Sequence, residues 1–161
     1  MSRLDSVIRR LEAQRACLDL AANLVRDVPG PVLELGLGNG RTYDHLRVRL
    51  PGREIFAFDR ALAAHPDCVP DARHLVLGDM RETLARAALP APAALVHADI
   101  GSGDDAASRA IAAVLAPLIA RVLAPDGVVL ADQPMDDSGW RALALPAGVD
   151  HGRYFMWRRA R

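Results

Sequence analysis

The chain has 161 residues, 51% of them hydrophobic, which predicts a single compact domain with a core of its own. Twenty basic residues balance twenty acidic ones, and this zero net charge argues against a large nucleic-acid interface and against an anionic membrane surface as the main partner. All the basic residues are arginines, which excludes a Schiff-base lysine and a phosphate-binding GxxxxGKS/T loop.

The two cysteines, Cys17 and Cys68, lie far apart and lack the spacing of a metal site. They predict free thiols in a reducing compartment. Acidic residues interrupt the N-terminal segment, so it has no uninterrupted signal-peptide core. No apolar run reaches the ~20 residues that a membrane helix needs. We therefore expect a cytoplasmic protein.

Apolar residues recur at helical spacing from residue 3 to about residue 27, and Pro29-Gly30-Pro31 ends this predicted helix. Beyond it, apolar runs of strand length alternate with helical segments. The predicted strands are Val32–Leu35, Ile55–Phe58, Leu75–Leu77, Ala94–Ala98 and Val128–Ala131. The predicted helices are Thr42–Arg49, a short one near Ala61, Arg81–Ala88 and Ala106–Leu123. This alternation predicts right-handed βαβ units and a mainly parallel sheet with helices on both faces.

The end of the chain has a different pattern. Ala142–Leu145 and Tyr154–Trp157 are strand candidates with no helix between them, which predicts an antiparallel pair at the end of the sheet. The chain shows no repeat or linker. We expect one domain over residues 1–161, with an N-terminal helix at 1–28 and a three-layer α/β/α, Rossmann-like core at 31–161.

A glycine-rich turn follows the first predicted strand. Gly36, Gly38 and Gly40 form a GxGxG pattern with Glu34 two residues before it. Glycines there let a ligand approach the main chain closely. A nicotinamide dinucleotide site would need GxGxxG, and Arg41 stands where its third glycine belongs. An acid at the strand end repels phosphate and attracts a cation, which suits a ligand with a cationic amino-acid end, such as S-adenosylmethionine.

These residues resemble the first motif, ExGxGxG, of the class I S-adenosylmethionine-dependent methyltransferases. The resemblance extends from about Pro31 to Arg158. It implies a seven-stranded sheet whose last strand in sequence is antiparallel to the others. It also implies an S-adenosylmethionine-dependent methyltransferase activity.

Three acids follow the next strands at regular spacing. Asp59 comes 19 positions after Gly40, Asp79 comes 20 after Asp59, and Asp99 comes 20 after Asp79. An acid about 20 residues beyond such a turn can accept the ribose hydroxyls, a role that falls to Asp59. The resemblance implies that Asp79 accepts the adenine amino group and that Met80 covers the ring. The predicted cofactor contacts are Glu34, Gly36, Gly38, Asn39, Gly40, Asp59, Arg60, Gly78, Asp79, Met80 and Asp99.

Asp99 and His97 are the predicted catalytic residues. Side-chain alternation places them on the same side of a strand, and the pKa of a histidine suits a general base. The resemblance implies an alternative, a magnesium site of the catechol-type O-methyltransferases formed by Asp99, Asp132 and Gln133. Gln133 departs from the asparagine of that family, and capping of loops and helices by these acids is the competing interpretation. We therefore predict no resident metal.

The substrate is less defined than the cofactor. We expect a small-molecule acceptor. Because no acceptor motif stands out, a non-catalytic S-adenosylmethionine-binding module stays open as an alternative, and a nicotinamide-dependent oxidoreductase is a third that Arg41 disfavours. The arginines near the C-terminus flank a strand and do not indicate nucleic-acid binding. Since only the N-terminal helix is available to cover the cofactor, we also expect a homo-oligomer.

Overall fold

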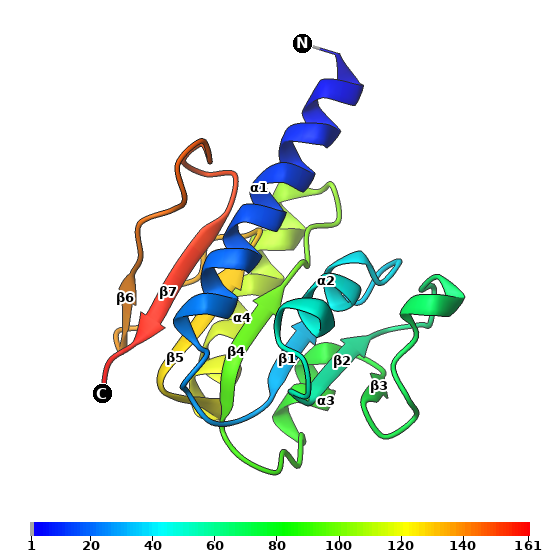
Figure 1. The fold of residues 1–161 in the computed structure, drawn as a ribbon, viewed down its shortest axis with the longest axis vertical. Helices are drawn as coiled ribbons and strands as arrows, with labels where there is room; N and C mark the ends of the chain where they lie inside the picture. The colour runs from blue at the N-terminus through cyan, green and yellow to red at the C-terminus, as the bar shows by residue number, and fades with distance from the viewer. Residues whose placement is uncertain (1) are drawn as a thin grey trace.

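The computed structural model describes residues 2–161. It contains one seven-stranded sheet with the strand order β3-β2-β1-β4-β5-β7-β6 (Figure 1). The elements in chain order are α1 (Arg3–Leu24), β1 (Val32–Leu35), α2 (Arg41–Arg49), β2 (Ile55–Asp59), the 3-10 helix η1 (Pro66–Cys68), β3 (Leu75–Leu77), α3 (Met80–Ala85), β4 (Ala93–Ala98), α4 (Asp105–Val122), β5 (Leu123–Ala131), β6 (Trp140–Ala142) and β7 (Phe155–Arg159).

The first five strands pair in parallel, and β7 lies antiparallel between β5 and β6. The predicted seven-stranded sheet with an antiparallel last strand is therefore confirmed. From β1 the chain first runs outward to β2 and β3, and it then returns to the other side of β1 as β4. The strand order thus reverses between β1 and β4, which is where open parallel sheets bind ligands.

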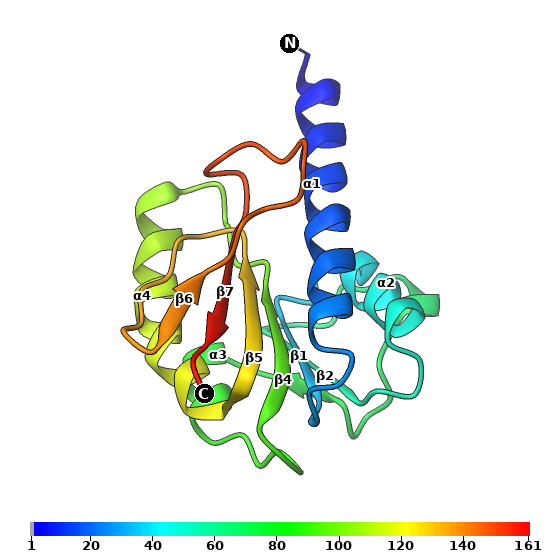
Figure 2. The same cartoon turned by 60° about the vertical axis from the view of Figure 1, so that its left-hand side comes forward.

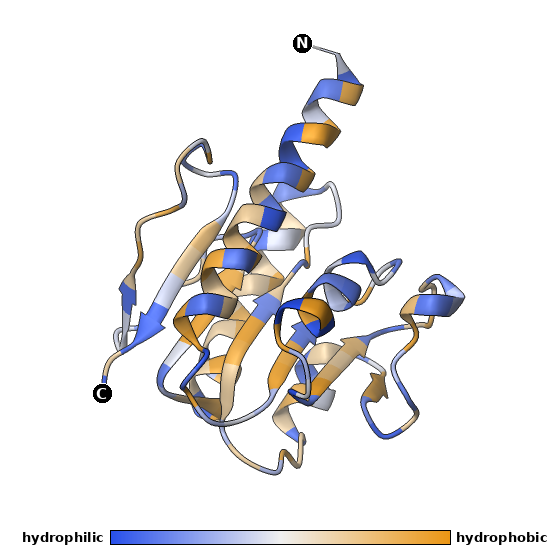
Figure 3. Cartoon of the chain, in the orientation of Figure 1, coloured by the Kyte–Doolittle hydropathy of each residue, from blue (hydrophilic) through white to orange (hydrophobic). Residues whose placement is uncertain are grey.

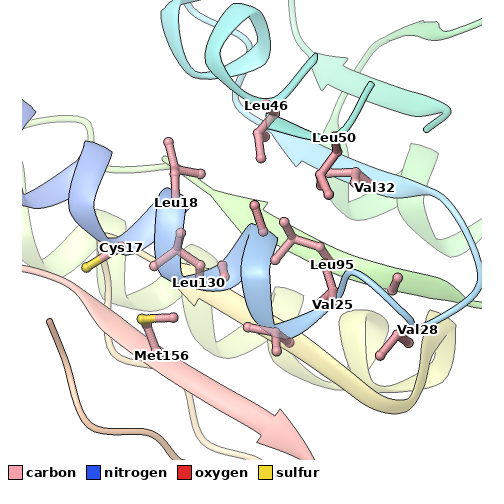
Figure 4. Packing of buried hydrophobic residues seen from close by; sticks show 14 of the residues in the cluster. Cys17, Leu18, Val25, Val28, Val32, Leu46, Leu50, Leu95, Leu130 and Met156 are labelled. Carbon is pink, nitrogen blue, oxygen red and sulfur yellow. The ribbon is translucent and has the colours of Figure 1, made fainter. Parts of the chain in front are cut away.

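Helices cover both faces of the sheet, with α1 and α2 on one side and α3 and α4 on the other (Figure 2). Leu18 of α1 and Val25, the C-cap of that helix, pack with Leu46 of α2 against Leu95 of β4 (Figure 4). Each of these side chains is at most 1% exposed, and burying one contributes about 1.5–3 kcal/mol. Hydrophobic residues accordingly concentrate on the central strands (Figure 3).

Helix α1 begins with a capping box. Ser2 Oγ accepts a hydrogen bond from the backbone N–H of Asp5 at 3.0 Å, and Asp5 Oδ2 accepts one from the backbone N–H of Ser2 at 2.9 Å. These bonds satisfy two amides that would otherwise lack partners. Its N-terminal turns extend beyond the sheet (Figures 1 and 2), while its later turns pack on the core.

The prediction of a short helix near Ala61 was wrong. That segment is non-helical, and η1 forms five residues later at Pro66. The four residues 61–64 are too few to nucleate a helix, and Pro66 disfavours helical backbone angles in the residue before it. Helix α3 stops at Ala85 instead of Ala88, and α1 stops at Leu24 instead of about residue 27.

The strand boundaries also differ at the end of the chain. Strand β6 begins at Trp140, two residues before the predicted Ala142–Leu145, and β7 begins at Phe155 and continues to Arg159. Strand β5 begins at Leu123, five residues before the predicted start. A register shift between Ala93 and Leu95 interrupts its pairing with β4.

Candidate functional site

A crevice of about 490 Å³ lies at the carboxyl ends of β1, β2 and β4. Its volume is typical of small-ligand sites. It is lined by α1, by the glycine turn, by the start of α2, by α4 and by the segments that follow β2, β3 and β4. The lining residues are Arg10, Leu11, Gln14, Gly36, Leu37, Gly38, Asn39, Arg41, Thr42, Asp59, Arg60, Met80, Asp99, Ile100, Gly101, Ser102 and Ile111.

The glycine turn has two kinds of glycine. At Gly36, with φ of +91°, a Cβ atom would overlap the backbone carbonyl oxygen of Asp99, so the glycine allows β1 and β4 to end in close contact. At Gly38, by contrast, a Cβ atom would meet nothing within 4 Å. The space beside the main chain at Gly38 is therefore open.

Asp59 lies at the edge of this turn. Its Oδ2 accepts a hydrogen bond from the backbone N–H of Gly38 at 2.8 Å, and its Oδ1 accepts one from the backbone N–H of Arg60 at 2.6 Å. These two bonds fix the carboxylate beside the crevice. A carboxylate has about four acceptor positions, so Asp59 can still accept hydrogen bonds from ligand hydroxyls.

Glu34 does not line the crevice. Its side chain is fully buried and accepts hydrogen bonds from Thr42 Oγ1 and from His97 Nδ1, the latter at 2.7 Å. The strand register places Glu34 of β1 beside His97 of β4. We expected Glu34 to face a cationic ligand. In the structure its carboxylate is instead hydrogen-bonded to His97 and Thr42.

His97, one of the two predicted catalytic residues, is also fully buried. Its Nε2 lies 2.8 Å from the hydroxyl of Tyr154. Burial lowers the pKa of His97, but the carboxylates of Glu34, Asp99 and Asp132 together outweigh burial, with Glu34 contributing most of the three, so that the pKa is raised above its ordinary value. His97 lies outside the crevice lining and acts on the crevice only through its neighbours.

Asp99, the other predicted catalytic residue, does line the crevice. Its Oδ2 accepts a hydrogen bond from Gln14 Nε2 at 3.0 Å, and its Oδ1 lies 3.9 Å from Arg10 Nη1. Gln14 is only 5% exposed and also donates to the Tyr154 hydroxyl at 2.9 Å. Helix α1 therefore contributes directly to the site.

Asp79 lies outside the crevice although Met80, its neighbour, lines it. Asp79 is the N-cap of α3: its Oδ1 accepts a hydrogen bond from the backbone N–H of Arg81 at 2.9 Å. The Arg81 guanidinium pairs with the same carboxylate and holds the pKa of Asp79 well below its usual range. Gly78 lies with Asp79 beside a separate cavity next to β3.

Asp132, at the end of β5, organises the loop after β4. Its two carboxylate oxygens accept hydrogen bonds from the backbone N–H groups of Ile100 and Gly101, at 3.0 and 2.9 Å. Burial raises its pKa. Over residues 2–161 we find no cluster of three or more His, Cys, Asp or Glu side chains arranged to hold a metal ion.

Sequence reasoning missed Gln14, and it weighed Tyr154 only as a candidate weaker than His97, at the start of the final strand pair. The apolar stripe of α1 includes Leu11, Leu18 and Ala21, and Gln14 falls on the same face by the spacing of three and four residues. A polar residue at a position where the pattern calls for an apolar one is the signal that marks it.

A sequence model of the family described as S-adenosyl-L-methionine methyltransferase matches residues 1–159. The chain belongs to this family. A search of curated proteins finds no match to this methyltransferase. Among solved structures, the chain is similar to an S-adenosyl-L-methionine methyl transferase from Silicibacter pomeroyi DSS-3, with 46% identity over 99% of both chains and a TM-score of 0.91.

More distant structures share the fold of the methyltransferase. Cofactor-bound Rv0187 from MTB has 16% identity over 96% of this chain and 89% of its own, with a TM-score of 0.57. The O-methyltransferase TomG from Streptomyces achromogenes, solved with S-adenosylmethionine, has 14% identity over 92% and 80%, with a TM-score of 0.60. The predicted cofactor, S-adenosylmethionine, and the predicted enzyme class are thus confirmed at the level of the family.

Proposed function

We propose that this methyltransferase transfers a methyl group from S-adenosylmethionine, bound in the crevice, to a small molecule bound beside it. The observation that carries the proposal is the open main chain at Gly38, with the Asp59 carboxylate fixed next to it at the reversal of strand order. Of the predicted cofactor contacts, seven line the crevice: Gly36, Gly38, Asn39, Asp59, Arg60, Met80 and Asp99.

The lining suits the parts of the cofactor in order. Asp59 and Met80, on the β2 and β3 side, fit a ribose with two hydroxyls and an adenine ring. Asp99, on the β4 side, fits the cationic amino-acid end. Glu34, Gly40, Gly78 and Asp79 lie outside the lining, so we assign them to supporting the turn and α3.

When bound, S-adenosylmethionine supplies an already activated methyl group. The residues of the chain therefore have to orient an acceptor in line with that group and keep water away. A proton acceptor is needed only where the acceptor atom must lose a proton. Of the two predicted catalytic residues only Asp99 lines the crevice, and we assign its carboxylate to the amino end of the cofactor and not to this step.

A second cavity, of about 460 Å³, lies beyond the end of β5 and shares Arg10 with the crevice. With the adenosine on the β2 and β3 side and the amino end at Asp99, the cofactor would extend toward β4, and we propose the neighbouring cavity for the acceptor. Its lining includes two carboxylates, Asp132 and Asp150, and two guanidinium groups, Arg10 and Arg153. Asp132 is already bonded to two backbone N–H groups, whereas no carboxylate lies within 4.0 Å of the Arg153 guanidinium among residues 2–161. We therefore propose an acceptor that carries an acidic group.

Binding and transfer are tested separately. S-adenosylmethionine and its demethylated product should raise the Tm of the purified protein, and NAD should not. Tritiated methyl groups should then pass to the acidic fraction of a metabolite extract. Binding without transfer would favour the non-catalytic module. If neither S-adenosylmethionine nor its demethylated product raised the Tm, the proposed cofactor site would be contradicted.

The acidic-acceptor proposal has its own variant. Arg153→Gln should reduce transfer to the acidic fraction at least tenfold while the affinity for the cofactor is unchanged. Arg121→Gln is the matched control, because Arg121 is exposed on α4, across the sheet from α1. Equal activity of both variants would contradict a role for Arg153.

We also propose that the protein forms a homo-oligomer through the start of α1. Leu4, Val7 and Ile8 are 68%, 49% and 45% exposed there, which is unusual for three large apolar side chains so close together. Light scattering at micromolar concentration should give more than one chain mass.

Among residues 2–161 no helix is long and apolar enough to cross a membrane. Separately, we propose a cytoplasmic location, which suits the free thiols of Cys17 and Cys68.

A further inference from the structure

A continuous series of side-chain hydrogen bonds runs through the core from the start of α2 to the crevice. It joins four elements, α2, β1, β4 and α1, and the residue before β7. All its members except the last are buried, and three of them, Thr42, Gln14 and Asp99, line the crevice. The series is Thr42, Glu34, His97, Tyr154, Gln14 and Asp99.

Gln14 is the branch point of this series. Its Nε2 lies 2.9 Å from the Tyr154 hydroxyl and 3.0 Å from Asp99 Oδ2. A side-chain amide nitrogen carries two hydrogens, so both are used, one on each partner. Asp99 is thus tied to Tyr154 through a single amide group.

The Tyr154 hydroxyl also contacts His97. When His97 is neutral, the Tyr154 hydroxyl can donate to its Nε2 while Nδ1–H donates to Glu34. When His97 is protonated, both ring nitrogens donate, and its contact with Glu34 becomes an ion pair. In both states Tyr154 is fixed between His97 and Gln14, at 2.8 and 2.9 Å.

A purely structural core has little need of such a series. Buried polar groups that are fully paired contribute little net stability compared with apolar residues of the same shape. What this series does achieve is a fixed direction for the one carboxylate at its end. Arg10 is the other side chain that could bind this carboxylate. Its Nη1 lies 3.9 Å from Asp99 Oδ1, and its side chain is 48% exposed, so the contact is weak.

We propose that Gln14 and Tyr154 are positioning residues, which hold the Asp99 carboxylate in the crevice to receive the cationic amino end of the cofactor. This inference rests on the proposed function, since it takes the crevice as the cofactor site. Without Gln14, Asp99 is free to turn to Arg10, and its charge is then partly neutralised before the ligand arrives.

The test compares two ligands that differ in the amino-acid end. S-adenosylhomocysteine has it and 5′-methylthioadenosine lacks it. Calorimetric titration of Gln14→Leu and Tyr154→Phe should show S-adenosylhomocysteine weakened ~10- to 100-fold, as expected for a lost hydrogen bond to a charged group. The affinity for 5′-methylthioadenosine should change less than about twofold, because nothing in that ligand reaches Asp99.

Cys17→Ala is the matched control. Cys17 is buried on α1, three residues after Gln14, and lies outside the hydrogen-bond series (Figure 4). It should leave both affinities unchanged, so that a general loosening of α1 is excluded as the cause. Equal weakening of both ligands, or weakening of neither, would overturn the inference; a wild-type protein that binds neither ligand would instead overturn the proposed function. Tyr154→Phe keeps the aromatic ring, so the test holds if Gln14→Leu fails to fold.

Discussion

His97 Nδ1 lies 2.7 Å from Glu34 Oε2, and neither side chain has any exposed surface. The two residues are register neighbours on the central strands β1 and β4. The acid of the glycine motif thus serves the interior of the protein, where it accepts hydrogen bonds from two elements that flank the crevice. A buried pair of this kind has consequences for stability that can be measured.

Glu34→Gln should destabilise the protein by about 3–5 kcal/mol, because it leaves a buried partner without its counter-charge. The loss should be smaller for the double variant Glu34→Gln/His97→Leu than the sum of the single losses, since the two residues are in direct contact. Urea unfolding of all four proteins measures this coupling. Strictly additive losses would show that the pair does not interact.

The Glu34–His97 pair also predicts a pH dependence. The pKa of His97 is raised in the folded protein, so its contribution to stability is fully present below the unfolded pKa of about 6.5 and is lost as the pH rises through the folded pKa. The Tm difference between wild type and His97→Gln should therefore be largest at pH 5.5–6 and should shrink toward pH 9. A difference that grows with pH would contradict a raised pKa.

Much of the fold follows from local patterns. The bounds of β1 and β3, Val32–Leu35 and Leu75–Leu77, agree with the prediction to the residue. Strand β1 is apolar except for Glu34 because it is buried on both faces, whereas β3 is a partly exposed edge strand marked only by its apolar run. The convergence of Asp59 and Asp99 on one crevice likewise follows from parallel strands ending at the same edge. The prediction of a helix near Ala61 was wrong because Pro66 follows too closely, although the alanines of this segment favour a helix.

The directions of the polar side chains were beyond local reasoning. Glu34 turns inward because β4 places His97 beside it, a partner 63 positions away. Asp79 turns to Arg81 and the start of α3, away from the crevice. Gln14 meets Tyr154 across 140 positions of the chain, and only the docking of α1 beside the start of β7 brings the two together.

Asp59 and Asp79 should respond differently to the same substitution. Asp59→Asn should weaken S-adenosylhomocysteine ~10- to 100-fold, because one acceptor oxygen for the ribose hydroxyls is lost. Asp79→Asn should change that affinity little and should lower the Tm slightly, since Asp79 caps α3 and lies outside the crevice. Calorimetry and thermal unfolding of both variants separate the roles. If Asp79→Asn weakened the ligand as much as Asp59→Asn, the adenine contact first expected for Asp79 would be reinstated.

Gly36 and Gly38 should also separate stability from binding. Gly36→Ala places a Cβ against the carbonyl oxygen of Asp99 at a positive φ, so it should destabilise the protein by more than about 2 kcal/mol. Gly38→Ala meets nothing within 4 Å, so it should cost only the ~1 kcal/mol of left-handed strain while its methyl group narrows the crevice and weakens S-adenosylhomocysteine. Gly52→Ala is the control for strain alone, because Gly52 also has a positive φ and open space but lies away from the crevice. A Gly38→Ala protein that binds as tightly as Gly52→Ala would mean that the ligand does not approach the main chain at Gly38.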